Sequence, residues 1–598
     1  MPKADLTALA ARLEAHLGDP HDPASRMSFS EILDQDEREE YPYAFVNMLR
    51  HWGVPEYALP GEQGGRAGDV EAEFNLVRLI ARRDPTTATA LVITNLAFMP
   101  VWIAGSDAQK RVVVDAVKRG TRLSWGLSER AYGSDLLANA MTARKVDGGY
   151  RLSGEKWLIG NATWSDAVVV FARTGERPGP AAFSIFLLEK RDTPAGSVRE
   201  LPREKLHGLR GMDISGVAVD DVFVPDSALI GAEGQGLEIA LKATQTARAQ
   251  ISSIALSAVD TGLRLTLDFT EERVILGRPV SDIPYSRRQL TEVFADLMVA
   301  DAVSLGAVRG LQAAPEQASV SSSVTKYFVP TLLERTMSQL SVVLGARFFL
   351  RGHPHYGMFQ KLLRDLLVAN FADGNTVVNL RNLGAQLPQL LATATTSDPD
   401  TRRAAAERAA VLYGMDRELP PYEPWKQELS SRGGKDDTLL AAPDAVLVLR
   451  ELADGARESE RDRLLRAADV ADELLAHTGV LRERCEKLRV HLGREFGQAA
   501  ELFDLAKEYS LVHAAAACVL AYVHSRDALV DPLPSDAVLL LQLERLRRQL
   551  RPHESVSDQS VIDDVMRVVR HLHQENRLFS HAQLPLAERT ADLAAART

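Results

Sequence analysis

The spacing of apolar residues changes twice along the chain and divides it into helical and β-rich parts. Residues 1 to about 120 place apolar side chains three and four positions apart, which predicts helices. Near Leu123 the spacing becomes an alternation within short runs rich in β-branched residues, which predicts strands. From about Gly236 the helical spacing returns. The pattern therefore predicts a mainly α-helical protein with a central antiparallel β-domain.

These changes set the expected domain boundaries. We expect an N-terminal helical domain at 1–120, a middle β-domain at 121–235, a helical bundle at 236–400, a linker at 401–437 and a C-terminal helical extension at 438–598. The predicted strands cover 123–128, 139–146, 149–160, 166–173, 182–189 and 215–224, and the predicted bundle helices lie near 236–270, 287–312, 324–345, 358–371 and 375–394. The linker is inferred from the prolines and glycines between Pro420 and Gly434. A chain of 598 residues is also too long for a single core.

Charge and cysteine content narrow the possible functions. A formal net charge of -11 gives no overall basic surface, which argues against nucleic acid as a partner. Cys485 and Cys518, the two cysteines, form neither a disulfide framework nor a thiolate metal site, which favours a reducing compartment. The first residues contain no apolar signal core, and no later stretch is expected to span a bilayer. We therefore expect a cytoplasmic protein.

Histidine positions do not suggest a metal centre. His353 and His355 stand in a loop of prolines and glycines, with no third ligand nearby in the sequence. We expect both histidines to be surface residues and predict no metal site. Phosphate-binding loops, zinc-protease motifs and hydrolase nucleophile motifs are also not found in the sequence.

Short motifs follow one another in a fixed order between about residues 80 and 390. Ser128-Glu129 precedes Gly133-Ser134-Asp135, and Trp157 ends a predicted hairpin about twenty residues later. Further on are an Arg273–Gly277 run, a Gln339–Gly345 run, and Asp373-Gly374 after a predicted helix. This ordered set resembles the acyl-CoA dehydrogenase flavoproteins, whose domains run helical, β and helical in the same order. In that family a glutamate usually stands where this chain has Asp373.

The resemblance implies FAD as the cofactor and gives a role to each motif. It makes Asp373 the catalytic base, with Gly374 beside it, and places Arg248 near the substrate entrance. Ser134 would face both the flavin and the carrier end of the substrate. The remaining cofactor contacts that the resemblance implies are Leu127, Ser128, Trp157, Ile159 in the position near flavin N5, Asn375 and Thr376, with Arg273, Gln339 and Gly345 reaching the FAD across a dimer interface.

The implied reaction is α,β-desaturation of an acyl thioester carried by CoA or by a carrier protein. Asp373 would remove the α-proton while a hydride passes to flavin N5. Burial between apolar helices and a flavin disfavours the ionised carboxylate and raises its pKa toward neutral pH, as a general base requires. The extension at 438–598 resembles in position that of the larger family members, which are typically dimers, so a homodimer is expected. The sequence does not specify the electron acceptor.

Two other functions remain open at this point. Asp is one methylene shorter than Glu, and nitroalkane oxidase, which resembles this family, uses an aspartate as its base. The chain is therefore compatible with a flavin oxidase or monooxygenase on the same fold. The third alternative is a non-catalytic or nucleic-acid-associated member of the family.

Overall fold

Helices form the N-terminal part of the molecule. The computed structural model describes residues 3–59, 64–66, 69–552 and 558–590, so the ends of the predicted first and last domains (residues 1–2 and 591–598) lie outside it. Asp69 caps the fourth helix, and Ser106 and Gln109 form a reciprocal capping box at the sixth. The helices are α1 (Lys3–Leu17), α2 (Phe29–Arg38), α3 (Tyr43–Trp52), α4 (Val70–Ala81), α5 (Pro85–Ala104) and α6 (Asp107–Lys118).

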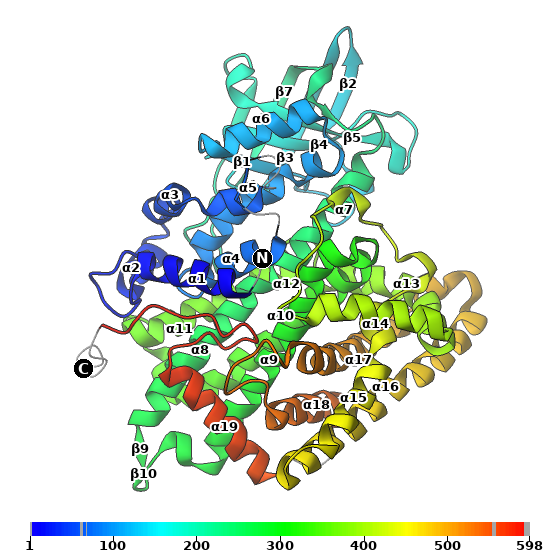
Figure 1. Cartoon of the computed structure of the whole chain (residues 1–598). Coiled ribbons are helices and arrows are strands. Elements are labelled where there is room, and N and C mark those ends of the chain that lie inside the picture. Colours follow the sequence, from blue (N-terminus) through cyan, green and yellow to red (C-terminus); the bar gives the residue numbers. More distant parts are fainter. Residues whose placement is uncertain (1–2, 60–63, 67–68, 553–557, 591–598) are drawn as a thin grey trace.

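The middle domain is one twisted sheet that stands at one end of the molecule (Figure 1). Its path runs β6-β7-β3-β2-β4-β5-β8, with β1 beside β4. Most pairs are antiparallel, as predicted, but β1 pairs with β4 in parallel, and β2 meets β4 in parallel at one position. The short β6 and β8 were not predicted. The strands are β1 (Leu123–Gly126), β2 (Thr142–Val146), β3 (Gly149–Gly160), β4 (Ala167–Arg173), β5 (Phe183–Glu189), β6 (Val198–Leu201), β7 (Ile214–Pro225) and β8 (Leu229–Ile230).

The helical bundle that was predicted at 236–400 lies next to the sheet (Figure 1). The single helix predicted near 236–270 is two helices that meet at Ile251. A small hairpin, β9 (Val274–Ile275) and β10 (Arg278–Pro279), projects at the end far from the sheet (Figure 1). The helices are α7 (Gly236–Gln250), α8 (Ser252–Glu272), α9 (Pro284–Ala313), α10 (Ala318–Leu344), α11 (Pro354–Asp365), α12 (Val368–Phe371) and α13 (Thr376–Thr396).

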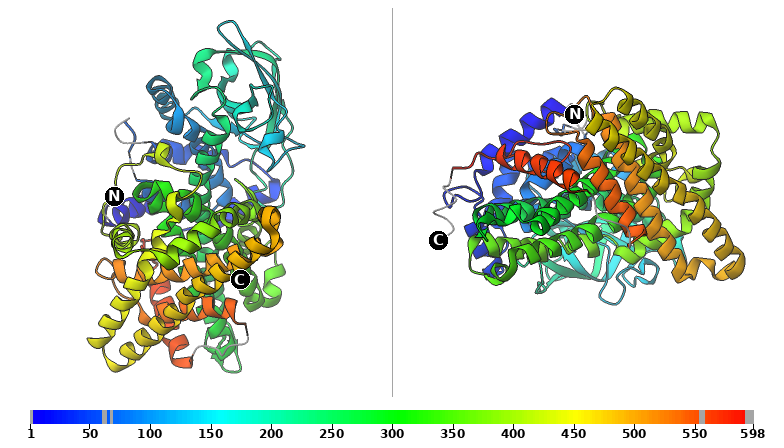
Figure 2. Two further views of the ribbon diagram at one scale, coloured as in Figure 1. Left: turned by 90° about the vertical axis from the view of Figure 1, so that its right-hand side faces the viewer. Right: turned by 90° about the horizontal axis from the view of Figure 1, so that it is seen from below.

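The predicted linker is shorter than expected and is packed against the bundle. Asp398 caps α14 (Pro399–Tyr413), so the segment without regular helix begins at 414 and not at 401. Within it Gln427 is fully buried and donates from Nε2 to Thr246 Oγ1 of α7 at 2.9 Å. The extension then adds helices that lie along α9 and α13 (Figure 2). They are α15 (Asp437–Asp454), α16 (Glu458–Leu492), α17 (Ala500–Ser525), α18 (Asp536–Leu550) and α19 (Gln559–Gln574).

After α19 the chain returns along α8 and reaches α1 (Figure 1). Three of its backbone N–H groups donate to buried carboxylates that already pair with arginines at the end of α4. Phe579 donates to Asp260, His581 to Asp301 and Ala587 to Glu14, at 2.8, 2.8 and 2.9 Å. The arginine partners of these acids are Arg82, Arg78 and Arg83, respectively. Because it also buries Leu578, Phe579 and Leu584 completely, this returning segment is part of the core.

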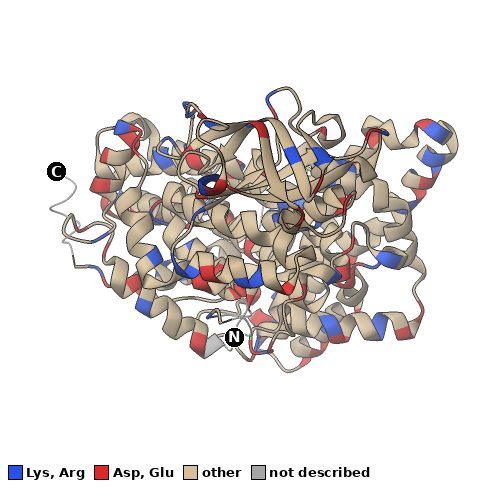
Figure 3. Ribbon diagram, turned by 90° about the horizontal axis from the view of Figure 1, so that it is seen from above, with Lys and Arg blue, Asp and Glu red and all other residues tan. Residues whose placement is uncertain are grey.

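Helix α5 lies between the sheet and the bundle, and it corrects one sequence expectation. By length and composition alone it could cross a membrane, although no such stretch was expected. Of its most apolar window, 67% is buried inside the structure, as in the core helix of a folded domain. Seen from above, acidic and basic residues are interspersed over the molecule (Figure 3).

Candidate active site

The predicted base turn lies between α12 and α13. Asp373 and Gly374 both have positive φ, +54° and +91°, a conformation that costs a non-glycine residue free energy and often marks functional sites. Asn375 caps α13: its side-chain oxygen accepts the N–H of Val378 at 3.0 Å, and Thr376 begins the helix. The half-buried Asp373 carboxyl therefore stands at a helix N-terminus, where the helix dipole favours negative charge.

Two buried cations face this turn. Arg248 of α7 is 6% exposed, and its Nε donates to the backbone carbonyl of Asp373 at 3.0 Å. Lys326 of α10 is fully buried, and its Nζ donates to the carbonyl of Ala369 in α12. The two side chains hold the chain on both sides of the turn.

The charges of these groups are coupled. Burial raises the pKa of the Asp373 carboxyl, while Lys326 and Arg248 oppose that rise. Burial lowers the pKa of Lys326 to about 7 and that of Arg248 to about 10, and the Asp373 charge partly offsets both shifts. The arrangement gives a carboxyl with a pKa above its usual range and a lysine that titrates near neutral pH.

Lys326 was missed in the sequence analysis. Between residues 318 and 333 it is the sole charged side chain in a run of small and apolar residues, which was the available signal. A lone lysine on such a helix is either exposed or buried with a partner. Its partner is 43 residues away in the sequence, so the contact itself could not be predicted.

The backbone at the base turn also presents free donors. The N–H groups of Asp373 and Gly374 donate to no acceptor among the described residues. Two adjacent N–H groups near a helix N-terminus can donate hydrogen bonds to an oxygen that carries partial negative charge.

The predicted cofactor loop follows β1 and lies beside β3. Ser128 and Trp157 are joined across it: Ser128 Oγ donates to the Trp157 carbonyl at 2.9 Å, and Trp157 N–H donates to the Ser128 carbonyl at 3.0 Å. Leu127 is half-buried and Ser134 is exposed. A side chain at neighbouring Gly133 would meet nothing within 4 Å, so the loop faces open space.

Trp157 and Ile159 lie on different surfaces. The Trp157 indole donates to Glu204 at 2.7 Å and stacks with Arg130, whose guanidinium carbon is 4.4 Å from the ring centroid. The Ile159 side chain is 3% exposed and belongs to the core of the sheet. Ile159 stays the residue predicted near flavin N5, and because its side chain is buried, a contact with the cofactor would come from its backbone.

Leu158 and Gly160 stand on either side of Ile159 in β3 and have different surroundings. Leu158 is 49% exposed and has φ +60°. A side chain at Gly160 would meet Ile93 of α5 at 2.0 Å, so α5 and β3 approach closely there. On α5, Val92, Ile93 and Leu96 share a partly open apolar stripe.

A loop of the middle domain connects the cofactor strand to the base turn. Glu204, the partner of Trp157, precedes a segment that docks on the end of α11. There the Leu209 N–H donates to Asp365 Oδ1 at 2.6 Å, and Arg364 donates to the His207 carbonyl at 3.2 Å. The base turn follows α11 and α12, so the contacts between the domains fix β3 relative to Asp373.

Three predicted residues lie apart from the base turn and the cofactor loop within one chain. Arg273 is exposed at the base of the β9–β10 hairpin, at the end of the molecule far from the sheet (Figure 1). Gln339 is half-buried near the end of α10, and Gly345 is exposed just after it. The structure brings none of the three to Asp373 within a single chain.

The histidine expectation was half wrong. His355 is 7% exposed and its Nε2 lies 2.7 Å from the carbonyl of Leu265, so it is a core residue, while His353 is half-buried. No group of three metal-ligating side chains is found among the residues that the structure describes.

The comparisons with known proteins identify the class. The family models of the acyl-CoA dehydrogenase N-terminal, middle and C-terminal domains match residues 27–121, 124–222 and 234–387. The chain belongs to the acyl-CoA dehydrogenase family and is an FAD-dependent oxidoreductase. The open donors of the 128–134 loop, the partly exposed Trp157 ring and the apolar stripe on α5 fit a flavin. The non-catalytic alternative is therefore not kept.

Individual relatives are distant. An acyl-CoA dehydrogenase of Bacillus subtilis is 25% identical over 355 residues, which cover 58% of this chain and 90% of that protein. The structure of an acyl-CoA dehydrogenase from Bacillus anthracis, complexed with FAD, matches 96% of both chains with a TM-score of 0.68 and 16% identity, so the match includes the extension. The prolyl acyl carrier protein oxidase AnaB matches 63% of this chain and 97% of its own, with a TM-score of 0.56 and 19% identity.

Proposed function

We propose that the protein desaturates an acyl thioester at the α and β carbons, with Asp373 as the base. The observation that carries the proposal is the Asp373 turn, which combines a left-handed backbone, a carboxyl of raised pKa and two buried cations. A general base is most effective when its pKa lies near the working pH. Family membership supports acyl thioester dehydrogenation as the general chemistry.

Each residue of the turn then has a task. The Asp373 carboxylate takes the α-proton of the acyl group. The Asp373 and Gly374 N–H groups stabilise the thioester oxygen as negative charge develops on it, because they are fixed before the reaction begins. Arg248 and Lys326 hold the turn through the carbonyls of Asp373 and Ala369. When bound, FAD supplies the hydride acceptor.

The cofactor would be held mainly by the middle domain. Leu127, Ser128 and Ser134 would contact it from the loop, and Trp157 from β3. Asn375 and Thr376 would contact it from the start of α13. For Ile159 we propose a backbone contact alone, since its side chain is in the core.

We also propose a homodimer in which Arg273, Gln339 and Gly345 reach the cofactor of the partner. The support is exposed apolar surface near these residues: Leu276 on the hairpin is 91% exposed, and Val342 and Phe349 are 70% and 81% exposed. Such side chains are costly to leave in water when they gather at one place. Light scattering should give a dimer mass, and Leu276→Asp should shift it toward the monomer; a tetramer would contradict the proposal.

The proposed desaturation is tested by the visible spectrum of the purified, FAD-loaded protein. Anaerobic addition of acyl-CoA esters of several chain lengths should bleach the flavin absorbance for at least one of them. The same acyl groups on a phosphopantetheine carrier protein distinguish the two thioester carriers. If no thioester of either kind reduces the flavin, the proposed reaction is wrong.

A flavin oxidase is the second candidate, because the base is an aspartate and because the fold is similar to that of a prolyl acyl carrier protein oxidase. Oxygen consumption during turnover, with hydrogen peroxide as a product, would favour the oxidase. Turnover that needs an added electron acceptor would favour the dehydrogenase. For either enzyme we keep a cytoplasmic location as a proposal, supported by the two unpaired, buried cysteines.

A further inference from the structure

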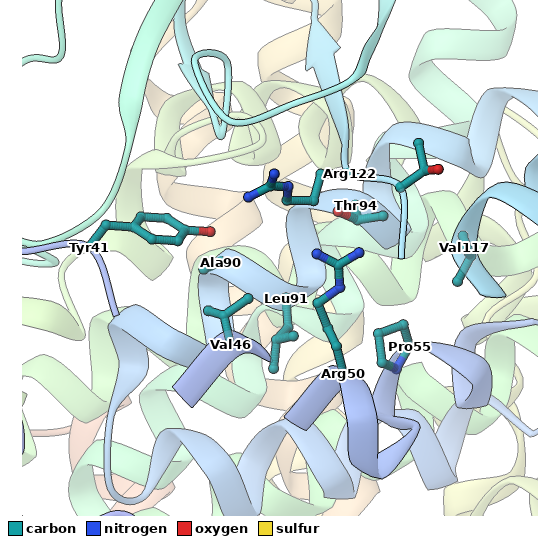
Figure 4. Close-up of a pocket in the computed structure, with 10 residues that line it drawn as sticks. Tyr41, Val46, Arg50, Pro55, Ala90, Leu91, Thr94, Val117 and Arg122 are labelled. Carbon is teal, nitrogen blue, oxygen red and sulfur yellow. The ribbon is translucent and has the colours of Figure 1, made fainter. Parts of the chain in front are cut away.

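A small pocket lies on the other side of α5 from the apolar stripe. It is shallow and open to solvent, and it is bounded by α3, α5, the end of α6 and the start of β1. Arg50 enters it from α3 and Arg122 from the chain just before β1, while Tyr41 approaches from the side (Figure 4). Thr94 and Thr121 add two hydroxyl groups to the lining.

Neither arginine side chain is bonded to a carboxylate among the described residues. No hydrogen bond or ion pair joins either guanidinium to the residues that the structure describes, and Arg122 Nε is buried without a partner. The nearest acids bond to other groups: Asp166 accepts the Arg122 backbone N–H at 2.9 Å, so its charge lies close to the pocket, and Asp213 accepts from Thr163 and Ser215. Burial and the neighbouring Arg122 charge both lower the pKa of Arg50, while Asp166 opposes part of this shift.

The pocket is nevertheless rigid. Arg122 lies 5.8 and 5.7 Å from the ring centroids of Tyr43 and Trp164, and its backbone is tied to Asp166. Tyr41 OH donates to Asn161 Oδ1 at 3.1 Å, and Asn161 in turn donates to the Ala90 carbonyl at 2.8 Å. A pair of like charges held in place by surrounding contacts is a pre-organised site for an anion.

Helix capping does not explain Arg50. Although it stands in the last turn of α3, the carbonyls of Leu49 and Arg50 accept the N–H of Gly53, and the Arg50 side chain takes no part. We propose that Arg50 and Arg122 form a binding site for a phosphate group. Two guanidinium forks match the charge and the oxygen spacing of a phosphate dianion, and the threonine hydroxyls suit its remaining oxygens.

The test measures binding of inorganic phosphate to the FAD-loaded protein by calorimetry and by thermal unfolding, with chloride keeping the ionic strength constant. We expect saturable stabilisation by phosphate. Arg50→Gln and Arg122→Gln should each weaken binding about tenfold or more, the effect of losing one charge-assisted hydrogen-bonded pair. Arg111→Gln, which removes an exposed arginine of α6, should leave the affinity unchanged.

A second readout separates binding from general damage. Without phosphate, Arg50→Gln should unfold at the same temperature as the unmodified protein or at a higher one, because repulsion is relieved. Arg50→Lys keeps the charge but loses the fork and should bind with intermediate affinity. Adenosine monophosphate as a second probe distinguishes a phosphate ester from free phosphate as the occupant. Phosphate that stabilises no more than chloride does, or an Arg111→Gln variant that binds as weakly as the pocket variants, would overturn the proposal.

Discussion

Asp373→Asn separates the charge of the proposed base from the shape of its turn. Asparagine has nearly the same size as aspartate and tolerates positive φ, so the backbone at +54° remains accessible to it. The Arg248 hydrogen bond uses the backbone carbonyl of residue 373, and the substitution leaves that acceptor in place. The variant should therefore fold, bind FAD and lose only the carboxylate.

The expected loss is large enough to measure easily. A positioned general base contributes a factor of about 10² to 10⁴ in rate. At about 1.4 kcal/mol for each factor of ten, this corresponds to about 3–5 kcal/mol in activation free energy. The assay is anaerobic stopped-flow reduction of the bound flavin by a thioester that reduces the unmodified protein.

Asp373→Glu is the matched control, since it keeps the carboxylate and changes its reach by about 1.5 Å, one C–C bond. A displacement of this size costs up to about a hundredfold in rate if nothing compensates. We expect Asp373→Glu to reduce the flavin at least ten times faster than Asp373→Asn. An Asp373→Asn variant that reduces FAD at the unmodified rate would refute the assignment of the base.

Three further predictions concern buried groups. Lys326→Met removes a cation that holds the pKa of Asp373 down. The rising limb of the pH–rate profile for flavin reduction should therefore move to higher pH. An unchanged profile would show that Lys326 has a structural role only. Burial raises the pKa of Glu73 from 4.5 to about 7. The free energy of unfolding therefore falls as the pH rises from about 4.5 to about 7. Glu73→Gln should therefore raise the free energy of unfolding by about 2–3 kcal/mol more at pH 8 than at pH 5 in urea titrations, with equal effects at both pH values as the contrary result. Phe579→Ala, in the returning C-terminal segment, removes a fully buried ring in contact with Phe294 and should lower the free energy of unfolding by about 3–5 kcal/mol. The exposed Glu588→Gln serves as its control. A decrease below about 1 kcal/mol would mean that the segment is not part of the core.

The periodicity of the sequence predicted the order of helical and β regions because burial of one face per element is a local pattern. It failed where the pattern is interrupted. A bulge between Trp157 and Ile159 shifts the register of β3 against β7, and simple alternation along a strand does not predict such a shift. The helix at 399–413 could have been found, since Asp398-Pro399 is a strong helix start followed by an alanine-rich run.

The turn at Asp373-Gly374 was predictable because Asp-Gly is a local turn signal. Its surroundings were not, since Arg248 and Lys326 come from helices far away in sequence. His355 was misread for a related reason: the loop composition around it suggested exposure, but the carbonyl that it contacts belongs to Leu265, 90 residues earlier. Contacts of this kind depend on helix packing, which no local pattern encodes.

The route of residues 576–590 has a consequence for how the protein is made. These residues complete the environment of Glu14, Asp260 and Asp301, acids that lie hundreds of positions earlier in the chain. While the ribosome is still adding the last helices, those carboxylates face their arginines without the final backbone donors. A polypeptide that stopped before residue 576 would therefore contain nearly all of the helices but would leave these three buried acids without their backbone donors.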